Sequence, residues 1–224
     1  MIIFKNVTKT FIAGNIALKN VSFEIKKNEF VFLTGPSGAG KSTIINLIIR
    51  KFIQTTGEII VDNFNLNEDF KEVDSLRKKI GVVFQDFKLI HSKTVEENIL
   101  IALKILGYKD KEAQEETEKV LEFVDLTDKK DYFPVQLSAG EQQKTAIARA
   151  IAGNRDIILA DEPTGNLDPA TSWKIVDIFS KLLNKKTIIF ATHNTDIVNS
   201  LKTRVIHLEN GKVVKDLKKG KYIL

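Results

Sequence analysis

Short apolar runs bounded by turn residues recur towards both ends of the 224-residue chain. Residues 2–4 and 21–25 are rich in β-branched and aromatic side chains, with a turn predicted at Gly14 and Asn15. Five further runs are almost continuously apolar: residues 30–34, 59–61, 80–84, 157–160 and 187–191. Such runs are typical of parallel strands covered on both faces. Residues 205–214 contain Asn210-Gly211, a strong signal for a two-residue hairpin.

The middle of the chain has a different periodicity. From residue 94 to about residue 153, apolar side chains recur at helical spacing, as in Val95, Ile99 and Leu103. The charged stretch 109–119 reads as a solvated face. We therefore predict an α/β fold in one domain, residues 1–224. Its core comprises residues 1–86 and 154–224, into which a mostly helical subdomain, residues 87–153, is inserted.

Composition and charge change this picture little. Hydrophobic residues make up 43% and charged residues 28%, and no apolar run approaches the ~20 residues that cross a bilayer. The N-terminus lacks the pattern of a signal peptide, and the chain contains no cysteine, so we expect a cytoplasmic protein. The net charge is 34 − 29 = +5. Five lysines gather near the end, and three interpretations stay open: a solvated surface, attraction to anionic lipid, or nucleic-acid binding. They are Lys212, Lys215, Lys218, Lys219 and Lys221.

The chemistry begins with a glycine-rich loop between a predicted strand and a predicted helix, residues 41–52. It has the pattern G-x-x-x-x-G-K-[ST] of a phosphate-binding (Walker A) loop, in which backbone N–H groups surround the phosphates of a nucleotide. Lys41 is expected to reach the β- and γ-phosphates, and the Ser42 hydroxyl to hold Mg²⁺. The residues expected to bind ATP here are Gly35, Pro36, Ser37, Gly38, Ala39, Gly40, Lys41, Ser42 and Thr43.

An acidic pair closes the run at residues 157–160. We expect Asp161 to bind Mg²⁺ through water and Glu162 to act as the general base on the attacking water. The alternative is a surface pair at the end of an edge strand. The phosphate-binding loop in the same chain favours the catalytic interpretation.

About a hundred residues after the loop, Leu137-Ser138-Ala139-Gly140-Glu141 resembles the signature peptide of ABC (ATP-binding cassette) ATPases. The resemblance covers essentially the whole chain. It implies a P-loop NTPase core with an N-terminal antiparallel β subdomain and an inserted helical subdomain. It also implies ATP and Mg²⁺ as cofactors, and a head-to-tail homodimer around two ATP molecules in which Ser138 and Gly140 of one subunit cap the γ-phosphate held by the other.

The same resemblance gives roles to further residues. Gln85 would sense Mg²⁺ and the attacking water, and His193 would contact the γ-phosphate as the switch histidine. Asp168 matches the D-loop, which crosses the dimer interface. Phe11 lies where an aromatic ring stacks on adenine, although a phenylalanine near a strand end is more often core. The catalytic residues are thus Glu162, His193, Gln85 and Lys41, and the metal-binding residues are Ser42, Gln85 and Asp161.

Two positions depart from the common L-S-G-G-Q signature, Ala139 and Glu141. Glutamate is frequent at the second position in close relatives. Alanine removes backbone freedom, so we expect Ala139 to strain or slow the closure of the dimer.

Several segments further resemble the cell-division ATP-binding proteins of the FtsE family: residues 84–89, 160–169, 171–173 and 204–216. This implies an integral membrane partner of FtsX type with four transmembrane helices, bound at the cytoplasmic face of a bacterial membrane, and activation of cell-wall hydrolysis. Phe87, Lys88 and Leu89 are candidates for the groove that receives the partner, unless Phe87 and Leu89 are core.

Two alternatives remain. One is the ATPase of a true transporter, for lipoprotein release, macrolide-type export or solute import. The other is a soluble ABC ATPase acting on DNA or ribosomes. The second has little support, because the chain has neither coiled-coil or zinc insertions nor a second cassette, and no nucleic-acid partner is expected.

Overall fold

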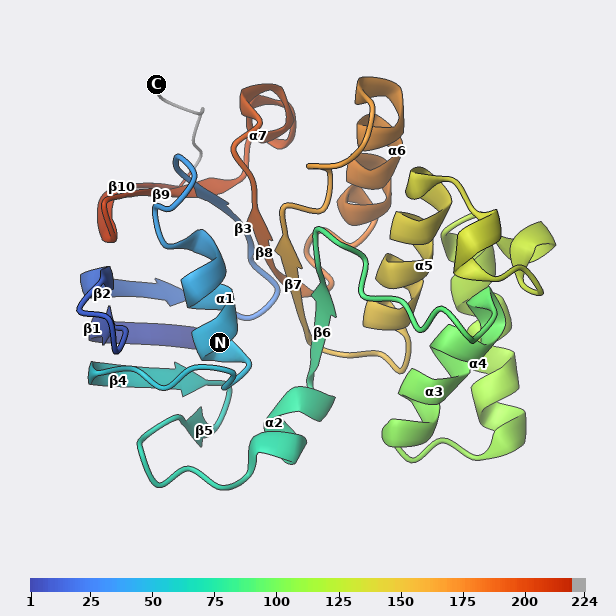
Figure 1. Ribbon diagram of the computed structural model, residues 1–224, viewed down its shortest axis with the longest axis horizontal. Helices are drawn as coiled ribbons and strands as arrows, with labels where there is room; N and C mark the ends of the chain where they lie inside the picture. Colours follow the sequence, from blue (N-terminus) through green and yellow to red (C-terminus); the bar gives the residue numbers. More distant parts are fainter. Residues whose placement is uncertain (219–224) are drawn as a thin grey trace. The chain divides into compact units, whose positions relative to one another are not determined.

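A computed structural model describes residues 1–218, so Lys219 and Lys221 of the lysine-rich ending lie outside the described residues. The chain forms two compact units. The first contains residues 1–77 together with the chain from residue 183 onward, and the second contains residues 78–182. Figure 1 labels the helices and strands along the chain.

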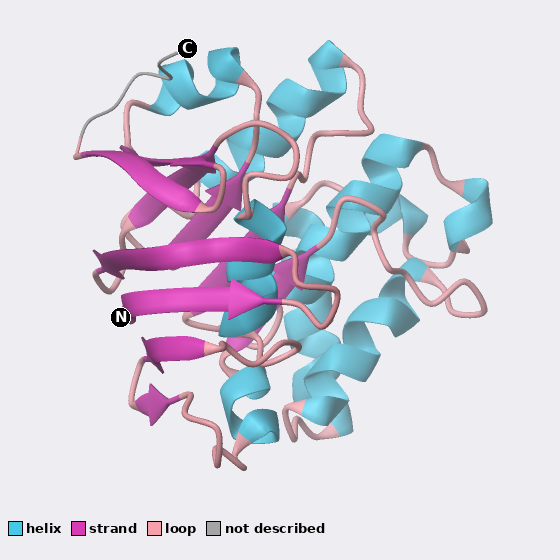
Figure 2. Ribbon diagram, turned by 60° about the vertical axis from the view of Figure 1, so that its left-hand side comes forward, coloured by secondary structure: helices cyan, strands magenta, loops and turns pink. Residues whose placement is uncertain are grey.

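The first unit contains an antiparallel sheet in the order β2-β1-β4-β5. Its strands are β1 (Ile2–Thr10), β2 (Ile16–Ile25), β4 (Thr56–Val61) and β5 (Phe64–Asn65). The grouping of residues 59–61 with the parallel strands is therefore wrong. Ile59 and Val61 are buried against the interior while Ile60 between them is half-exposed, the alternation of a sheet with one covered face. Figure 2 shows the strands of this sheet side by side near the N-terminus.

The same unit contains a second set of strands, in the order β10-β9-β3-β8. Strand β3 (Phe30–Thr34) pairs in parallel with β8 (Thr187–Ala191) and with β9 (Arg204–Glu209), and β10 (Lys212–Leu217) returns antiparallel to β9. Every residue of β3 and β8 is buried, as the continuous apolar runs predict. Asn210 and Gly211 form the predicted hairpin turn with positive φ angles of 48° and 76°.

Three helices complete the first unit: α1 (Lys41–Ile48), α2 (Val73–Lys78, which reaches the boundary) and α7 (Thr195–Leu201). The prediction that α1 extends to residue 52 is wrong. The helix ends because Arg50 is left-handed, with φ 55°. The Arg50 N–H donates to the Leu47 carbonyl at 3.0 Å and the Lys51 N–H to the Asn46 carbonyl at 2.9 Å, the pattern of a Schellman cap. The buried Arg50 guanidinium donates to the carbonyls of Leu66, Asn67 and Glu68, which explains an arginine where glycine is usual.

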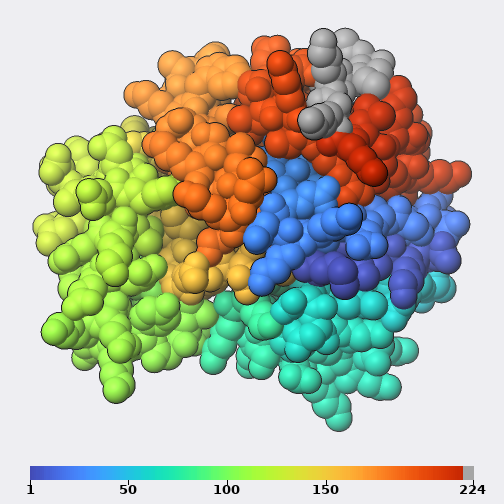
Figure 3. Space-filling view, turned by 180° about the vertical axis from the view of Figure 1, so that it is seen from behind, coloured from blue at the N-terminus to red at the C-terminus, as the bar shows by residue number. Residues whose placement is uncertain are grey.

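The second unit contains two parallel strands, β6 (Ile80–Val83) and β7 (Ile157–Asp161). Its helices are α3 (Val95–Ile105), α4 (Asp110–Phe123), α5 (Ala139–Ile151) and α6 (Pro169–Ser180), with short 3-10 turns at Thr127–Lys129 and Pro134–Gln136. Val95, Ile99 and Leu103 are fully buried on one face of α3, which confirms the helical periodicity. In the space-filling view, α3 and α4 form a broad part of this unit's surface (Figure 3).

Candidate functional site

The loop between β3 and α1 has the backbone that phosphate binding requires. Gly35 and Gly40 have φ angles of 140° and 109°, which strain any residue with a side chain. A Cβ atom at Gly35 would lie 2.2 Å from the Leu208 carbonyl oxygen, and one at Gly40 would lie 2.9 Å from the Ala17 carbonyl oxygen. The loop is therefore packed directly against neighbouring backbone, and only glycine fits at these two positions.

Lys41 opens helix α1 and turns back over this loop. Its side chain is buried, and the Nζ atom donates to the carbonyls of Gly35 at 2.8 Å and Pro36 at 3.1 Å. Ser42 and Thr43 follow in the first turn of the helix, where backbone N–H groups carry partial positive charge. The loop, the ammonium group and the helix N-terminus together form a site for an anion.

His193 and Phe11 also belong to the first unit. His193 is exposed just after β8, and the next residue, Asn194, caps α7 by accepting from the N–H groups of Asp196 and Ile197 at 3.0 and 3.1 Å. The half-buried Phe11 ring lies edge-on to Phe52, with ring centroids 5.2 Å apart.

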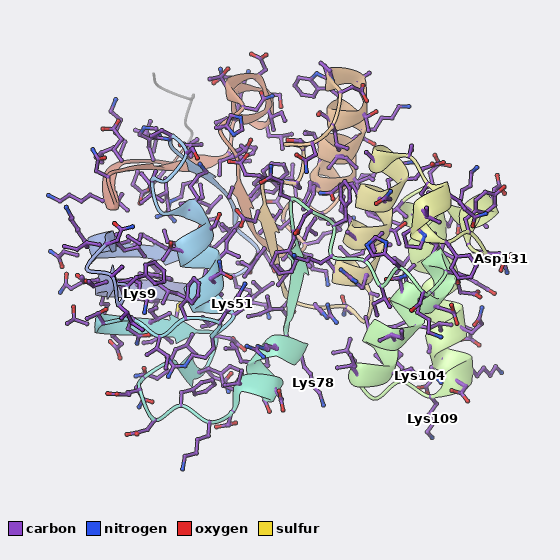
Figure 4. All side chains as sticks on the ribbon, in the orientation of Figure 1. Lys9, Lys51, Lys78, Lys104, Lys109 and Asp131 are labelled. Atoms are coloured by element: carbon purple, nitrogen blue, oxygen red, sulfur yellow. The ribbon has the colours of Figure 1, made fainter. Side chains whose placement is uncertain are left out.

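Two lysines, labelled in Figure 4, accompany these rings. Lys9 Nζ lies 5.1 Å from the centroid of Phe11, and Lys51 Nζ lies 6.0 Å from that of Phe52. A cation over an aromatic face is an attractive contact. The Phe11 ring thus has one cationic neighbour and one aromatic neighbour in the first unit.

The acidic pair lies in the second unit, at the end of β7. Asp161 is the last residue of the strand, and both Asp161 and Glu162 are half-buried. Glu162 has a left-handed backbone with φ 49°, and its carbonyl accepts from the Gly165 N–H at 3.0 Å in a tight turn. The strand end therefore gives way at once to a sharply turned segment that starts at Glu162.

Gln85 follows β6 in the same unit and pairs with Asn166. The Gln85 amide donates to the Asn166 side-chain oxygen at 3.3 Å, and the Asn166 amide donates to the Gln85 backbone carbonyl at 3.0 Å. The sequence places Asn166 only as a member of the D-loop motif. Its pairing with Gln85, 81 positions earlier in the chain, is visible only in three dimensions.

The signature residues form a compact helix cap. The Ser138 N–H and Oγ both donate to the Glu141 carboxylate at 2.8 Å, while the Glu141 N–H donates to Ser138 Oγ at 3.3 Å. The hydrogen bond from the Ser138 backbone, followed by that from its side chain, lowers the pKa of Glu141 below its ordinary value. The glutamate at this departure from the common pattern thus fixes the signature serine.

The effect of Ala139 on closure of the dimer stays a prediction, but its backbone is that of an ordinary helical residue. Helix α5 begins at Ala139, whose φ angle is not positive, so the backbone at this position does not require glycine. Gly140 is the position that demands glycine, because a Cβ atom there would lie 2.5 Å from Thr171 Cγ2. The constraint at Gly140 is therefore close packing between α5 and α6.

Asp168 is the N-cap of α6. Its Oδ1 accepts from the Thr171 N–H at 3.0 Å, and hydrogen bonds from Thr171, the side-chain bond first, lower the pKa of Asp168. The D-loop aspartate therefore has a structural contact within the second unit.

The segment after Gln85 is held by an arginine that the sequence gives no reason to select. Phe87 and Lys88 are both left-handed, with φ angles of 59° and 50°. Arg149 of α5 donates to the Lys88 carbonyl at 2.8 Å and to the Phe87 carbonyl at 3.1 Å, and burial lowers the pKa of Arg149. Leu89 is 7% exposed and belongs to the interior, so of the three groove candidates only Phe87 and Lys88 reach the surface.

Metal-binding side chains do not cluster in the part of the chain that is described. Within residues 1–218, no three or more His, Asp or Glu side chains come together as a metal site. Over the same residues, no helix is both long and apolar enough to cross a bilayer.

The phosphate-binding loop, the acidic strand end and the capped signature helix define an ATPase cassette, and comparison with known proteins agrees. The profile of the ABC transporter family matches residues 18–165, and the chain belongs to this family. The cell division ATP-binding protein FtsE of Bacillus subtilis is 46% identical over 224 residues, 99% of this chain and 98% of the relative. FtsE of Mycobacterium tuberculosis is 42% identical over 99% of this chain and 98% of the relative.

A solved dimeric bacterial ABC transporter cassette superposes with a TM-score of 0.88 at 40% identity, covering 99% of this chain and all of that one. The same cassette in a post-hydrolysis state, bound to ADP and phosphate, gives a TM-score of 0.86 over 99% of this chain and all of that one, at 38% identity. The chain is therefore an ATP-hydrolysing cassette, and the predicted P-loop fold, ATP binding and ATPase class are confirmed.

Proposed function

We propose that this chain is the ATPase subunit of a cell-division complex, in which two copies close head to tail around two ATP molecules and drive a membrane partner. The observation that carries the nucleotide half is the phosphate-binding loop, where Lys41 Nζ lies on the carbonyls of Gly35 and Pro36 at the start of α1. Residues 87–153 act as the helical signature subdomain, and residues 1–86 with 154–224 form the nucleotide-binding core.

In this proposal the triphosphate takes the place of those two carbonyls as the partner of Lys41. A lysine already buried in the loop needs only to exchange one set of oxygens for another, and the backbone N–H groups of Gly38 to Thr43 bind the β- and γ-phosphates. Phe11 stacks on adenine through the face opposite Lys9. Each of these contacts is made by the first unit alone.

Residues that follow β6, β7 and β8 supply the hydrolytic chemistry. Glu162 takes a proton from the attacking water, Gln85 orients that water, and His193 contacts the γ-phosphate. The donor set of Ser42, Gln85 and Asp161 suits Mg²⁺, which binds few protein groups and keeps water and phosphate oxygens as its remaining ligands. When bound, Mg²⁺ neutralises charge on the β- and γ-phosphates.

Dimerisation follows from the signature cap. Ser138 and the N–H groups near Gly140 stand at the N-terminus of α5, where a phosphate is electrostatically favoured. In a head-to-tail dimer this terminus meets the γ-phosphate held by the other copy, and Asp168 crosses the interface with the D-loop. ATP therefore stabilises the closed dimer, and hydrolysis releases it.

The membrane half of the proposal is supported by the names of the relatives, which are cell division ATP-binding proteins over almost their full length. The partner is an integral membrane protein of FtsX type with four transmembrane helices, and the cassette binds it peripherally at the cytoplasmic face of the bacterial membrane. The half-buried Phe87 and the exposed side chains of Lys88 and Ile90 offer it a mixed apolar and cationic surface. Movement of this partner activates cell-wall hydrolysis without transport of a solute.

The test is to express Glu162→Gln in native membranes, purify it with ATP and identify what accompanies it. This variant should bind ATP, lose turnover and accumulate as a dimer, while Lys41→Ala should lose both ATP and the dimer. Recovery of a four-helix partner with cell-wall hydrolases or their activators supports the division role. A six-helix permease or a lipoprotein-handling partner refutes that role, and wild-type turnover by Glu162→Gln refutes the base.

A further inference from the structure

Gln143 lies on helix α5, two residues beyond the signature peptide, and its side chain is fully buried. Its Nε2 donates to the Pro163 carbonyl at 2.6 Å, whereas its Oε1 has no hydrogen-bond partner among the described residues. A buried acceptor without a partner has lost its water and gained no hydrogen bond in return, which is unfavourable. Gln143 therefore stands at this position at some cost to the stability of the fold, in exchange for one short contact.

That contact is made to the residue directly after Glu162. Glu162 is left-handed with φ 49°, a backbone state that is unfavourable for a residue with a Cβ atom. The following proline disfavours helical backbone at the preceding residue and contributes no N–H of its own. Such a conformation persists only when its surroundings fix it.

Two hydrogen bonds fix it here. The Gly165 N–H closes the turn on the Glu162 carbonyl at 3.0 Å, and Gln143 holds the next carbonyl along the chain. The first bond is local to the turn. The second comes from the signature helix, 20 positions away, and is the only side-chain bond to this turn's Pro163 carbonyl among the interactions described for residues 1–218.

We propose that Gln143 is a positioning residue for hydrolysis, which sets the direction of the Glu162 carboxylate by holding the Pro163 carbonyl. The proposal rests on the assignment of Glu162 as the general base. It couples the signature helix to the base through a single amide, so the base is aligned only while α5 keeps its place. A displacement of about 1 Å in a reacting group can cost about 100-fold in rate.

The test uses the full chain with Gln143→Met, which keeps the length and flexibility of the side chain but cannot donate to Pro163. The change also removes the unpaired acceptor, so the gain and the loss in folding free energy largely offset each other. We expect a melting temperature near that of the wild type, an ATP dissociation constant within about twofold, and a kcat lower by about 10- to 100-fold. Gln143→Leu gives a second side chain without a donor, should the methionine variant fold poorly.

Thr145→Val is the matched control. Thr145 is also fully buried on α5, but its hydroxyl donates within the helix to the Glu141 carbonyl at 2.8 Å. It should leave kcat unchanged. If Thr145→Val lowers kcat as much as the Gln143 variants do, then the loss of any buried polar group on α5 is enough to lower kcat. The proposal would then fail.

A double-mutant comparison separates positioning from a general structural role. In the Glu162→Gln background, Gln143→Met should lower the residual rate no further, because both changes remove the same function. Wild-type kcat in the Gln143 variants, or an equal further loss in the Glu162→Gln background, would overturn the proposal. Failure of the base assignment appears separately, as full turnover by Glu162→Gln alone.

Discussion

The close contact between Gly140 and Thr171 predicts a steric coupling that can be measured. In Gly140→Ala, the added methyl group would lie 2.5 Å from Thr171 Cγ2, well inside van der Waals contact. Thr171 is β-branched and therefore stiff, and rotating it would break its side-chain hydrogen bond to Asp168. Overpacking of this kind costs about 1–3 kcal/mol, and the better helix propensity of alanine returns up to about 1 kcal/mol. We expect a net loss of about 1–2 kcal/mol in the free energy of unfolding.

For a chain of this length, that loss lowers the melting temperature by about 2–8 °C. The assay is thermal unfolding without nucleotide, so that the proposed phosphate contact of Gly140 does not enter. Thr171→Ser removes the clashing methyl group and keeps the hydroxyl, and in that background Gly140→Ala should be neutral or slightly stabilising. An equal drop in melting temperature in both backgrounds would refute the reasoning, since the cost would then not come from Thr171.

Three further predictions also concern the free energy of unfolding. In Gly81→Ala, the new Cβ atom would lie 1.9 Å from the Ala150 carbonyl oxygen, which as backbone cannot swing aside, so unfolding should become easier by about 3 kcal/mol. Arg50→Gly and Arg50→Ala both lose the bonds to residues 66–68, but Arg50→Ala should be less stable by about a further 1 kcal/mol because φ is 55°. The lowered pKa of Glu141 means that its carboxylate contributes stability above the unfolded value of 4.5 and loses it as pH falls through the folded pKa. Denaturant titrations from pH 6 to pH 3 should therefore show a steeper loss for the wild type than for Glu141→Gln, and parallel curves would contradict this.

Much of the fold could be predicted from the sequence wherever the local pattern of apolar residues matches the burial of the element. The continuous apolar runs at β3 and β8 match the observed strands residue for residue, because both are buried on every side. The prediction for residues 59–61 was wrong because three residues are too few to distinguish an alternating pattern of buried side chains from a continuously buried one. The end of α1 was missed for another reason: Arg50 takes a conformation usual for glycine, supported by carbonyls that lie 16 or more positions away.

The candidate site divides in the same way. The residues expected to bind nucleotide could be predicted because their chemistry depends on short motifs, such as the glycine loop around Lys41 and the acidic pair after β7. The residues that hold those motifs were not. Gln143, Arg149 and Asn166 act on backbone or amide groups 20 to 81 positions distant, and no local pattern reports such contacts.

The reciprocal pairing of Gln85 and Asn166 joins the segment after β6 to the segment before Asp168 through two hydrogen bonds. Each side-chain amide uses one of its two N–H groups in this pair, so a ligand that displaces the Gln85 side chain breaks its hydrogen bond to Asn166. Two neutral hydrogen bonds are worth about 1–3 kcal/mol together, little enough for one new contact to outcompete them. A ligand that binds one of these side chains therefore weakens its pairing with the other. By reciprocity, the coupling free energy is the same whichever side chain is bound first.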